Sequence, residues 1–125
     1  MSDDIYPIDY TILPDDIKKS LPALRSQQDS SDPMVYTKFF CPWGAATWWI
    51  LEYDGDDILF GFAYLINEES AELGYISKED LESIRGFGGL RIERDHNFEP
   101  KKLSQALFAH GLKTAAKGFD ETLNE

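Results

Sequence analysis

The sequence predicts an α+β fold: a small antiparallel β-meander sheet with short helices packed on one face and at the C-terminus. Residues 47–53 are apolar on both faces, which is typical of a central strand covered on both sides. Asp54-Gly55 follows directly, and it is a strong hairpin signal because a type I′ turn needs positive φ at both central residues. Signals for helix starts stand before and after this meander, at residues 14–16 and 77–80.

The expected meander consists of residues 34–40, 47–53 and 58–66, with a short fourth strand at 72–76. Strand alternation places Val35, Thr37 and Phe39 on one face of the first strand. In the second strand, Trp48 and Ile50 face one way, and Trp49, Leu51 and Tyr53 face the other. We expect both indoles of this strand to be substantially buried. Gly61 and Ala63 in the third strand are small positions that a helix could approach closely.

Short helices are expected on either side of the strands. Pro14 before two aspartates begins the first, since proline and acids both suit a first turn. Ser77 begins the second as a capping box with Asp80, and Gly86 stands where a left-handed cap would end it. Residues 90–94 form a fifth strand, and a C-terminal helix with Leu103 and Leu107 on its apolar side follows Pro100.

The 125 residues predict a single domain, 1–125, with a loose N-terminal arm at 1–10 and a frayed tail at 118–125. No apolar run approaches the roughly 20 residues that span a bilayer, and the acidic start does not resemble a signal peptide. We therefore expect a cytoplasmic protein. Cys41 is the single cysteine and there are two histidines, so the sequence predicts neither a disulfide nor a metal site, and no cofactor.

The net charge of −11 is unevenly distributed. Residues 1–76 hold fourteen acids and four bases, whereas residues 77–125 hold nine acids and eight bases. Direct binding of nucleic acid is disfavoured, because phosphates require Lys and Arg. The charge is either a solubility device or a face offered to a basic partner, such as a nucleic-acid-binding protein. The candidate contacts are Glu52, Asp54, Asp56, Asp57, Glu68, Glu69 and a partly exposed Trp43.

The sequence contains few motifs that are typical of catalysis or of cofactor binding. Gly86-x-Gly88-Gly89 lacks the Lys-Ser/Thr of a phosphate loop. A catalytic alternative, a small hydrolase or transferase, would bring His96, Arg94 and either Glu72 or Glu93 into one pocket. A small-ligand module would instead use Tyr75, Arg85, Arg94 and His96. Since no nucleophile or cofactor motif stands out, we expect a non-catalytic protein.

A series of short motifs carries a resemblance that covers about residues 12 to 103. They are, in order, Val35-Tyr36, Lys38-Phe39-Phe40, Pro42-Trp43, Thr47-Trp48-Trp49, Glu52-x-Asp54-Gly55-x-Asp57, Phe60-Gly61, Glu72-Leu73-Gly74-Tyr75, Leu81 to Gly86 and Ile92-Glu93-Arg94-Asp95. Together they resemble the uncharacterised bacterial family called domain of unknown function 2958. The resemblance implies a small, soluble, acidic protein of a type frequent on plasmids, integrative elements and phages. It brings no catalytic residue or cofactor.

Overall fold

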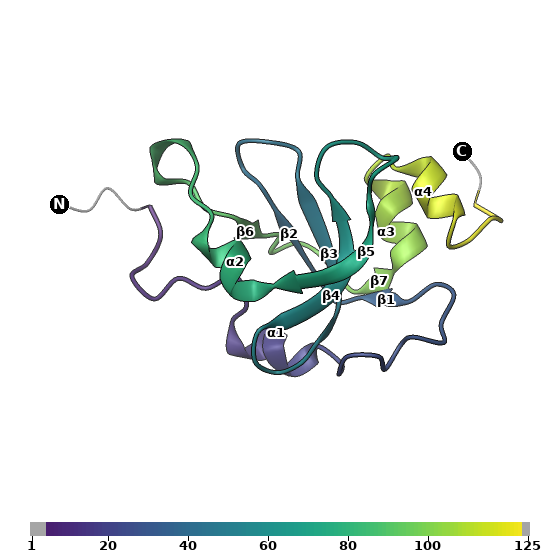
Figure 1. Ribbon diagram of the computed structural model, residues 1–125, viewed down its shortest axis with the longest axis horizontal. Helices are drawn as coiled ribbons and strands as arrows, with labels where there is room; N and C mark the ends of the chain where they lie inside the picture. The colour runs from purple at the N-terminus through teal and green to yellow at the C-terminus, as the bar shows by residue number, and fades with distance from the viewer. Residues whose placement is uncertain (1–4, 124–125) are drawn as a thin grey trace.

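The computed structural model describes residues 5–123 and has the predicted α+β architecture (Figure 1). An antiparallel five-stranded sheet has the order β5-β4-β3-β2-β6. Its strands are β2 (Thr37–Phe40), β3 (Thr47–Tyr53), β4 (Ile58–Tyr64), β5 (Glu72–Ser77) and β6 (Glu93–Arg94). A separate ribbon pairs β1 (Met34–Val35) with β7 (Lys101–Lys102). The helices are α1 (Asp15–Ser20), α2 (Lys78–Ser83), α3 (Leu103–Ala109) and α4 (Lys113–Lys117), with a 3₁₀ turn at Phe87–Gly89.

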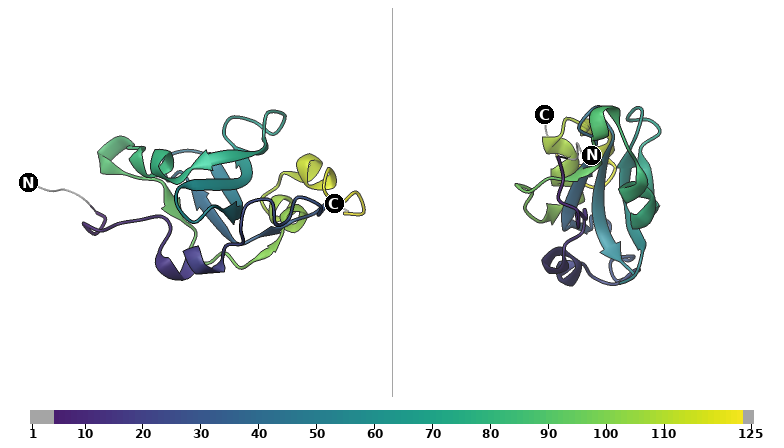
Figure 2. Two further views of the ribbon diagram at one scale, coloured as in Figure 1. Left: turned by 60° about the horizontal axis from the view of Figure 1, so that its bottom comes forward. Right: turned by 90° about the vertical axis from the view of Figure 1, so that its left-hand side faces the viewer.

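Strand β3 is the centre of the molecule, as predicted, and every one of its seven residues is buried. Trp48 and Ile50 belong to a first apolar cluster, which α2 and the segment around α1 complete. Trp49 and Leu51 belong to a second cluster, which α3 and α4 cover. Both indoles are therefore buried. Helices α1 and α2 lie toward one end of the sheet, and α3 and α4 lie toward the other (Figure 2).

A β-bulge in β3 changes which side chains share a face. Ile50 pairs with Gly61 of β4, but the next pair is Glu52 with Phe60, so Leu51 is an extra residue. A bulge of this kind breaks the strict alternation of a strand. Tyr53 consequently packs in the first cluster, and the prediction that it shares a face with Trp49 and Leu51 is wrong.

Gly61 lies opposite Ile50, directly beside this bulge. A Cβ at Gly61 would collide with the backbone oxygen of Trp49 and approach Ile50, so the close neighbour is strand β3 and not a helix as expected. The first predicted strand also divides, at Tyr36. Val35 packs in the second cluster and Phe39 in the first, so the predicted common face of Val35, Thr37 and Phe39 is not formed.

Two predicted turns differ from expectation. The β3–β4 connection has four residues, 54–57, and Arg25 is the sole described non-glycine residue with positive φ, so Asp54-Gly55 does not form a type I′ turn. Asp54 instead closes the loop with its side chain. Helix α2 begins after the predicted Ser77 cap, whose hydroxyl accepts from the Asp80 N–H at 3.2 Å. It ends in extended backbone at Ile84, and Gly86 has φ −109°, so no left-handed cap is present there.

The described parts of both terminal segments contact the sheet or its clusters. The Tyr6 hydroxyl donates to Glu93 at 2.6 Å, and the Tyr10 hydroxyl donates to the Ile92 carbonyl at 2.7 Å. At the other end, the Phe119 ring lies 5.9 Å from the Phe62 ring, and Leu123 packs against the second cluster. Residues 1–4 of the predicted loose arm and residues 124–125 of the predicted frayed tail lie outside the described residues. None of the described helices is long and apolar enough to cross a membrane.

Candidate functional site

Two adjacent hollows lie on the second-cluster side of β4 and β5, and Leu73 and Phe119 line both. We call the first the Glu52 pocket. Its lining consists of Arg25, Gln27, Gln28, Ser30, Pro33, Leu51, Glu52, Phe60, Leu73, Tyr75 and Phe119. We call the second the acidic hollow. Its lining consists of Phe62, Glu68, Glu69, Ala71, Glu72, Leu73, Thr114, Ala115 and Phe119.

The polar wall of the Glu52 pocket is built around a buried carboxylate. Glu52 is only 3% exposed, and its two oxygens accept the backbone N–H groups of Arg25 and Gln27, each at 2.8 Å. Gln27 in turn fixes the following segment, since its side chain bonds the N–H and carbonyl of Met34 and the carbonyl of Leu51. Glu52, which we expected on an exposed acidic face, is therefore an internal anchor of the chain.

The bulge accounts for this position of Glu52. Leu51 is the extra residue, and Glu52 pairs with Phe60, whose ring packs against the second cluster. Glu52 is thus placed beside that cluster, beneath the segment that carries Arg25 and Gln27. A pattern of alternating faces alone does not reveal such a shift.

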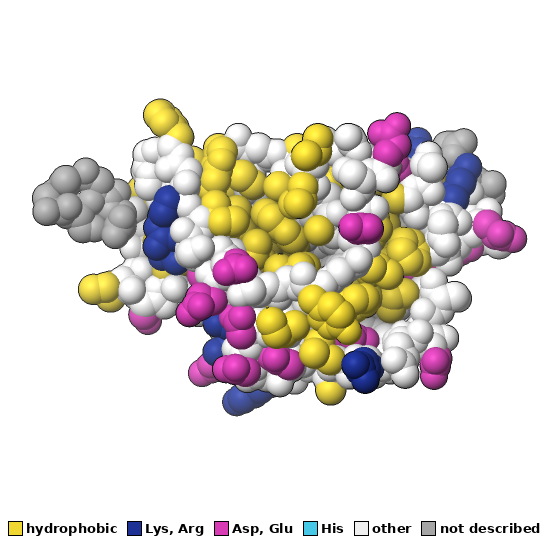
Figure 3. Space-filling view, in the orientation of Figure 1, with side chains coloured by type: hydrophobic (Ala, Val, Ile, Leu, Met, Phe, Trp, Pro, Cys, Tyr) yellow, Lys and Arg dark blue, Asp and Glu magenta, His cyan; other side chains and the backbone are white. Residues whose placement is uncertain are grey.

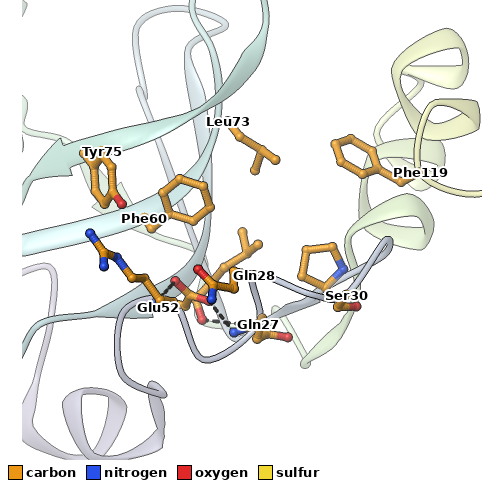
Figure 4. A pocket seen from close by; sticks show the side chains of 11 residues that line it. Gln27, Gln28, Ser30, Glu52, Phe60, Leu73, Tyr75 and Phe119 are labelled. Carbon is orange, nitrogen blue, oxygen red and sulfur yellow. Dashed lines mark hydrogen bonds between the residues drawn. The ribbon is translucent and has the colours of Figure 1, made fainter.

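The other wall of the Glu52 pocket is aromatic and aliphatic. Phe60 and Tyr75 lie with their ring centroids 5.1 Å apart, and Leu73 and Phe119 face each other across the opening (Figure 4). The pocket is open to solvent on one side, and its volume is about 240 Å³. Tyr75 is 62% exposed although it is large and apolar, so this wall is available to a ligand.

The acidic hollow combines carboxylates with apolar surface. Glu68, Glu69 and Glu72 lie at its rim, and the lining also includes Phe62 and Leu73. Its volume is about 680 Å³. Glu68 accepts the Ala115 N–H of α4 at 2.7 Å. The side-chain carboxylates of Glu69 and Glu72 accept no hydrogen bond from any residue between 5 and 123.

The connection between β4 and β5 adds further apolar surface beside these acids. Leu65 and Ile66 are 54% and 81% exposed, and Asn67 alone separates them from Glu68 and Glu69 in the chain. Exposed large apolar side chains that gather in one place mark interaction surfaces more often than single ones do. Figure 3 shows a broad hydrophobic band across this view of the molecule, with acidic side chains gathered around α2 and the β3–β4 loop.

The acids of that β3–β4 loop have structural partners. Asp54 accepts the N–H groups of Asp56, Asp57 and Ile58 at 2.8, 2.8 and 3.0 Å, and these bonds, that from Asp56 first, lower the pKa of Asp54. Asp57 accepts the Ser77 hydroxyl at 2.7 Å and the Glu79 N–H at 2.8 Å, and the same two bonds lower its pKa. Asp57 therefore helps to cap α2.

Trp43 is 39% exposed, which confirms that it is partly accessible. Its ring lies against the backbone of Gly86, where a Cβ would come within 2.5 Å of the ring. This contact with the Trp43 ring, and not a left-handed helix cap, is the reason for glycine at position 86. The Trp43 indole lies apart from the lining of both hollows.

The residues of the small-ligand and catalytic alternatives do not form one site. Tyr75 and Glu72 stand on β5, one edge of the sheet, whereas Glu93 and Arg94 stand on β6, the opposite edge. The Arg94 guanidinium lies 3.2 Å from Nδ1 of His96, and the Glu93 carboxylate accepts a hydrogen bond from the Tyr6 hydroxyl. Arg85 donates to the carbonyls of Glu82 and Ile84 near the end of α2. Of these candidates, Tyr75 lines the Glu52 pocket and Glu72 lines the acidic hollow, and the others line neither.

Several residues of interest have no clear sequence signal. Arg25 and Gln27 stand in a stretch without a recognisable motif, and Phe119 lies in the segment expected to fray. His110 packs edge-on to Trp49 at 5.0 Å, and burial, with a smaller effect of Lys38, lowers its pKa. Leu73 and Tyr75 do have a signal, because they alternate along β5. Within residues 5–123 no group of three or more His, Cys, Asp or Glu could hold a metal ion.

Comparison with known proteins identifies the family and gives no function. A family model described as "Protein of unknown function (DUF2958)" matches residues 12–115, which include α3 and the start of α4. No curated protein and no solved structure matches the chain. The match covers most of the 125 residues and agrees with the motifs found in the sequence. The chain therefore belongs to the DUF2958 family of proteins of unknown function.

Proposed function

We propose that this protein is a non-catalytic interaction protein that binds a basic protein partner, and that the acidic hollow is the contact surface. One observation carries the proposal: Glu69 and Glu72, which have no hydrogen-bond donor among the described residues, stand beside the exposed apolar surface of the β4–β5 connection. Carboxylates attract a basic partner and raise its association rate. Apolar contacts supply the affinity that charge alone does not.

The main contact surface is then the acidic hollow and not the β3–β4 loop. Asp54 and Asp57 are occupied with backbone and hydroxyl donors, so binding through them would compete with bonds that hold the loop and α2. Their charge still adds to the long-range field of the protein, because Asp54 is exposed and Asp57 is only partly buried. Asp56 and Trp43 would then be peripheral contacts.

Nucleic-acid-binding proteins are the partner class that we favour. Such proteins present clustered Lys and Arg to phosphates, and an acidic protein competes for the same surface. A mobile element would gain from a protein that occupies a host factor in this way, which accords with the distribution that the family resemblance implies. The net charge of −11 supports electrostatic attraction of this kind.

The test uses capture from host lysate by the intact protein at low and at high salt. The Glu69→Gln/Glu72→Gln variant removes two charges from the hollow. The matched control, Asp56→Asn/Glu79→Gln, removes two charges from exposed positions outside it. We expect capture of a basic protein at low salt, weakened at high salt because the screening length between exposed charges falls from about 10 Å at 0.1 M salt to about 3 Å at 1 M.

The captured partner is then purified and titrated against each variant. The hollow variant should bind roughly tenfold more weakly than the control, as expected when close charge pairs are lost. Equal weakening by both variants would show that only the total charge matters, and it would remove the hollow from the proposal. Undiminished binding by both would leave the acidic residues as a solubility device.

A further inference from the structure

The Glu52 pocket has the features of a ligand site, and they differ from those of the acidic hollow. We propose that it binds a small molecule with one aromatic or aliphatic body and one anionic group, a carboxylate or a phosphate, and that Arg25 contacts the anion. This inference does not depend on the proposed function, since it rests on other residues and another ligand chemistry.

The polar side of the pocket is fixed from within. The Glu52 carboxylate bonds the N–H groups of Arg25 and Gln27, and the Gln27 side chain bonds both Met34 and Leu51. Hydrogen bonds to a carboxylate are stronger than neutral ones, and here they lie in a buried place. The backbone at Arg25 is thus held in position before any ligand arrives, which reduces the cost of ordering on binding.

Arg25 itself has an uncommon backbone. Its φ is 70°, and no other non-glycine residue between 5 and 123 has a positive φ. Residues in this region persist only where the surroundings hold them, and they cluster at ligand sites. The two bonds from Glu52 are the surroundings that hold Arg25, so the fold maintains an unfavourable conformation at the wall of a cavity.

The guanidinium group of Arg25 is available. It forms no hydrogen bond or ion pair with any described residue, although the chain contains 23 acids. Arginine presents five N–H donors in a planar arrangement that matches carboxylate and phosphate oxygens. A cationic ligand would need a free carboxylate, and both oxygens of the one carboxylate in the lining are already bonded. The pocket therefore favours an anion.

The apolar side sets the size of the ligand. Phe60, Leu73, Tyr75 and Phe119 surround a volume of about 240 Å³ (Figure 4). A cavity of about 150 Å³ accommodates a benzene ring, so this one holds a single ring with a short acidic arm. Tyr75 and Phe60 would pack on the ring, and the Tyr75 hydroxyl and Gln28 amide lie in the same lining as further polar groups.

The experiment titrates the intact ¹⁵N-labelled protein with phenylacetate, phenyl phosphate and, as the neutral control, phenylacetamide, followed by NMR. We expect the resonances of Arg25, Gln28, Leu73 and Tyr75 to shift with phenylacetate or phenyl phosphate. The stronger binder of the two identifies the anion class. Phenylacetamide should bind roughly tenfold more weakly, because it lacks the charge-assisted bond.

Three variants complete the test. Arg25→Gln should weaken the anionic probes roughly tenfold and leave phenylacetamide unchanged. Arg85→Gln, which removes another exposed arginine outside the pocket, should leave all three unchanged. Tyr75→Ala alters a side chain that is 62% exposed, and it should weaken all three probes.

Three results of this experiment would contradict the proposed ligand site. Probe shifts outside the pocket, or affinities that Arg25→Gln does not change, would overturn the proposal. So would the absence of any shift with both anionic probes. The Glu69→Gln/Glu72→Gln variant should bind phenylacetate as the wild type does, so the outcome here is separable from that of partner capture.

Discussion

The two connections at either end of β4 are both acidic, and they use their acids differently. The β3–β4 loop, residues 54–57, directs the carboxylates of Asp54 and Asp57 to N–H and O–H donors of the loop and of α2. In the β4–β5 connection and the start of β5, Glu68 has one backbone donor, and Glu69 and Glu72 have none among the described residues. The two regions lie at opposite ends of the strand (Figure 1).

This difference shows that a high density of acids in a sequence does not by itself indicate a binding face. Charges near unpaired N–H groups become part of the fold, because buried or loop-closing donors need acceptors. Charges beside exposed apolar side chains, such as Leu65 and Ile66, remain available to a partner. Substitution of individual acids separates those that stabilise the fold from those that remain available to a partner.

The largest effect on the free energy of unfolding is expected at Glu52, whose two carboxylate oxygens both accept backbone N–H groups in a buried place. Glu52→Ala should lower the free energy of unfolding by about 3 kcal/mol, because two backbone N–H groups lose their acceptor in a buried place. Glu52→Gln retains one acceptor and should cost roughly half as much. Urea unfolding with an unchanged m value measures both. A loss below about 1 kcal/mol for Glu52→Ala would show that water replaces the carboxylate and that the pocket wall is not held as described.

The position of Glu52 also shows where sequence reasoning ends. The central strand 47–53, the burial of Trp48 and Trp49 and the Ser77 cap follow from local patterns, and the structure confirms them. Local patterns describe one strand at a time. The bulge at Leu51 depends on how β3 pairs with β4, so Glu52 and Tyr53 were assigned to the wrong surroundings.

The candidate site was harder to predict than the sheet. Glu68 and Glu69 are predicted contacts because of their charge, and Tyr75 belongs to the small-ligand alternative; these three residues line two adjoining hollows. Arg25 was not predicted, because a positive φ at an arginine has no sequence signature and depends on Glu52, 27 residues away. Phe119 was missed because its contact with Phe62 is also long-range.

An intermediate effect is expected from acid on the β3–β4 loop. The folded-state pKa values of Asp54 and Asp57 lie below their ordinary value of 3.8, so the unfolded chain takes up protons first as the pH falls. Their stabilisation is fully present above about pH 4 and is lost as the pH falls through the folded-state pKa values. The melting temperature of the wild type should therefore exceed that of Asp54→Asn/Asp57→Asn near pH 7, with a difference that shrinks below about pH 4.

The control for this prediction is Asp56→Asn, in the same loop. The Asp56 carboxylate accepts no hydrogen bond from a described residue, and the Tyr53 hydroxyl donates to the Asp56 backbone carbonyl, which the substitution keeps, so the melting temperature should stay within about 2 °C at every pH. A constant difference between the wild type and the double variant across the acid range would contradict the role of the two ionised side chains.

The smallest effect is expected within the acidic hollow, where two neighbouring acids should separate. Glu68→Ala removes the acceptor of the Ala115 N–H in α4 and should cost about 1 kcal/mol, as the loss of a helix-terminal acceptor does. Glu69→Ala removes a carboxylate without a donor in the described structure, and its melting temperature should stay within about 2 °C of the wild type. Thermal unfolding of the two single variants measures the difference. If Glu69→Ala destabilised the protein as much as Glu68→Ala, Glu69 would belong with the acids that hold the fold, and the hollow would offer a partner less free charge than we propose. If Glu69→Ala left stability intact while it weakened partner capture, folding and binding would be assigned to adjacent residues of one connection.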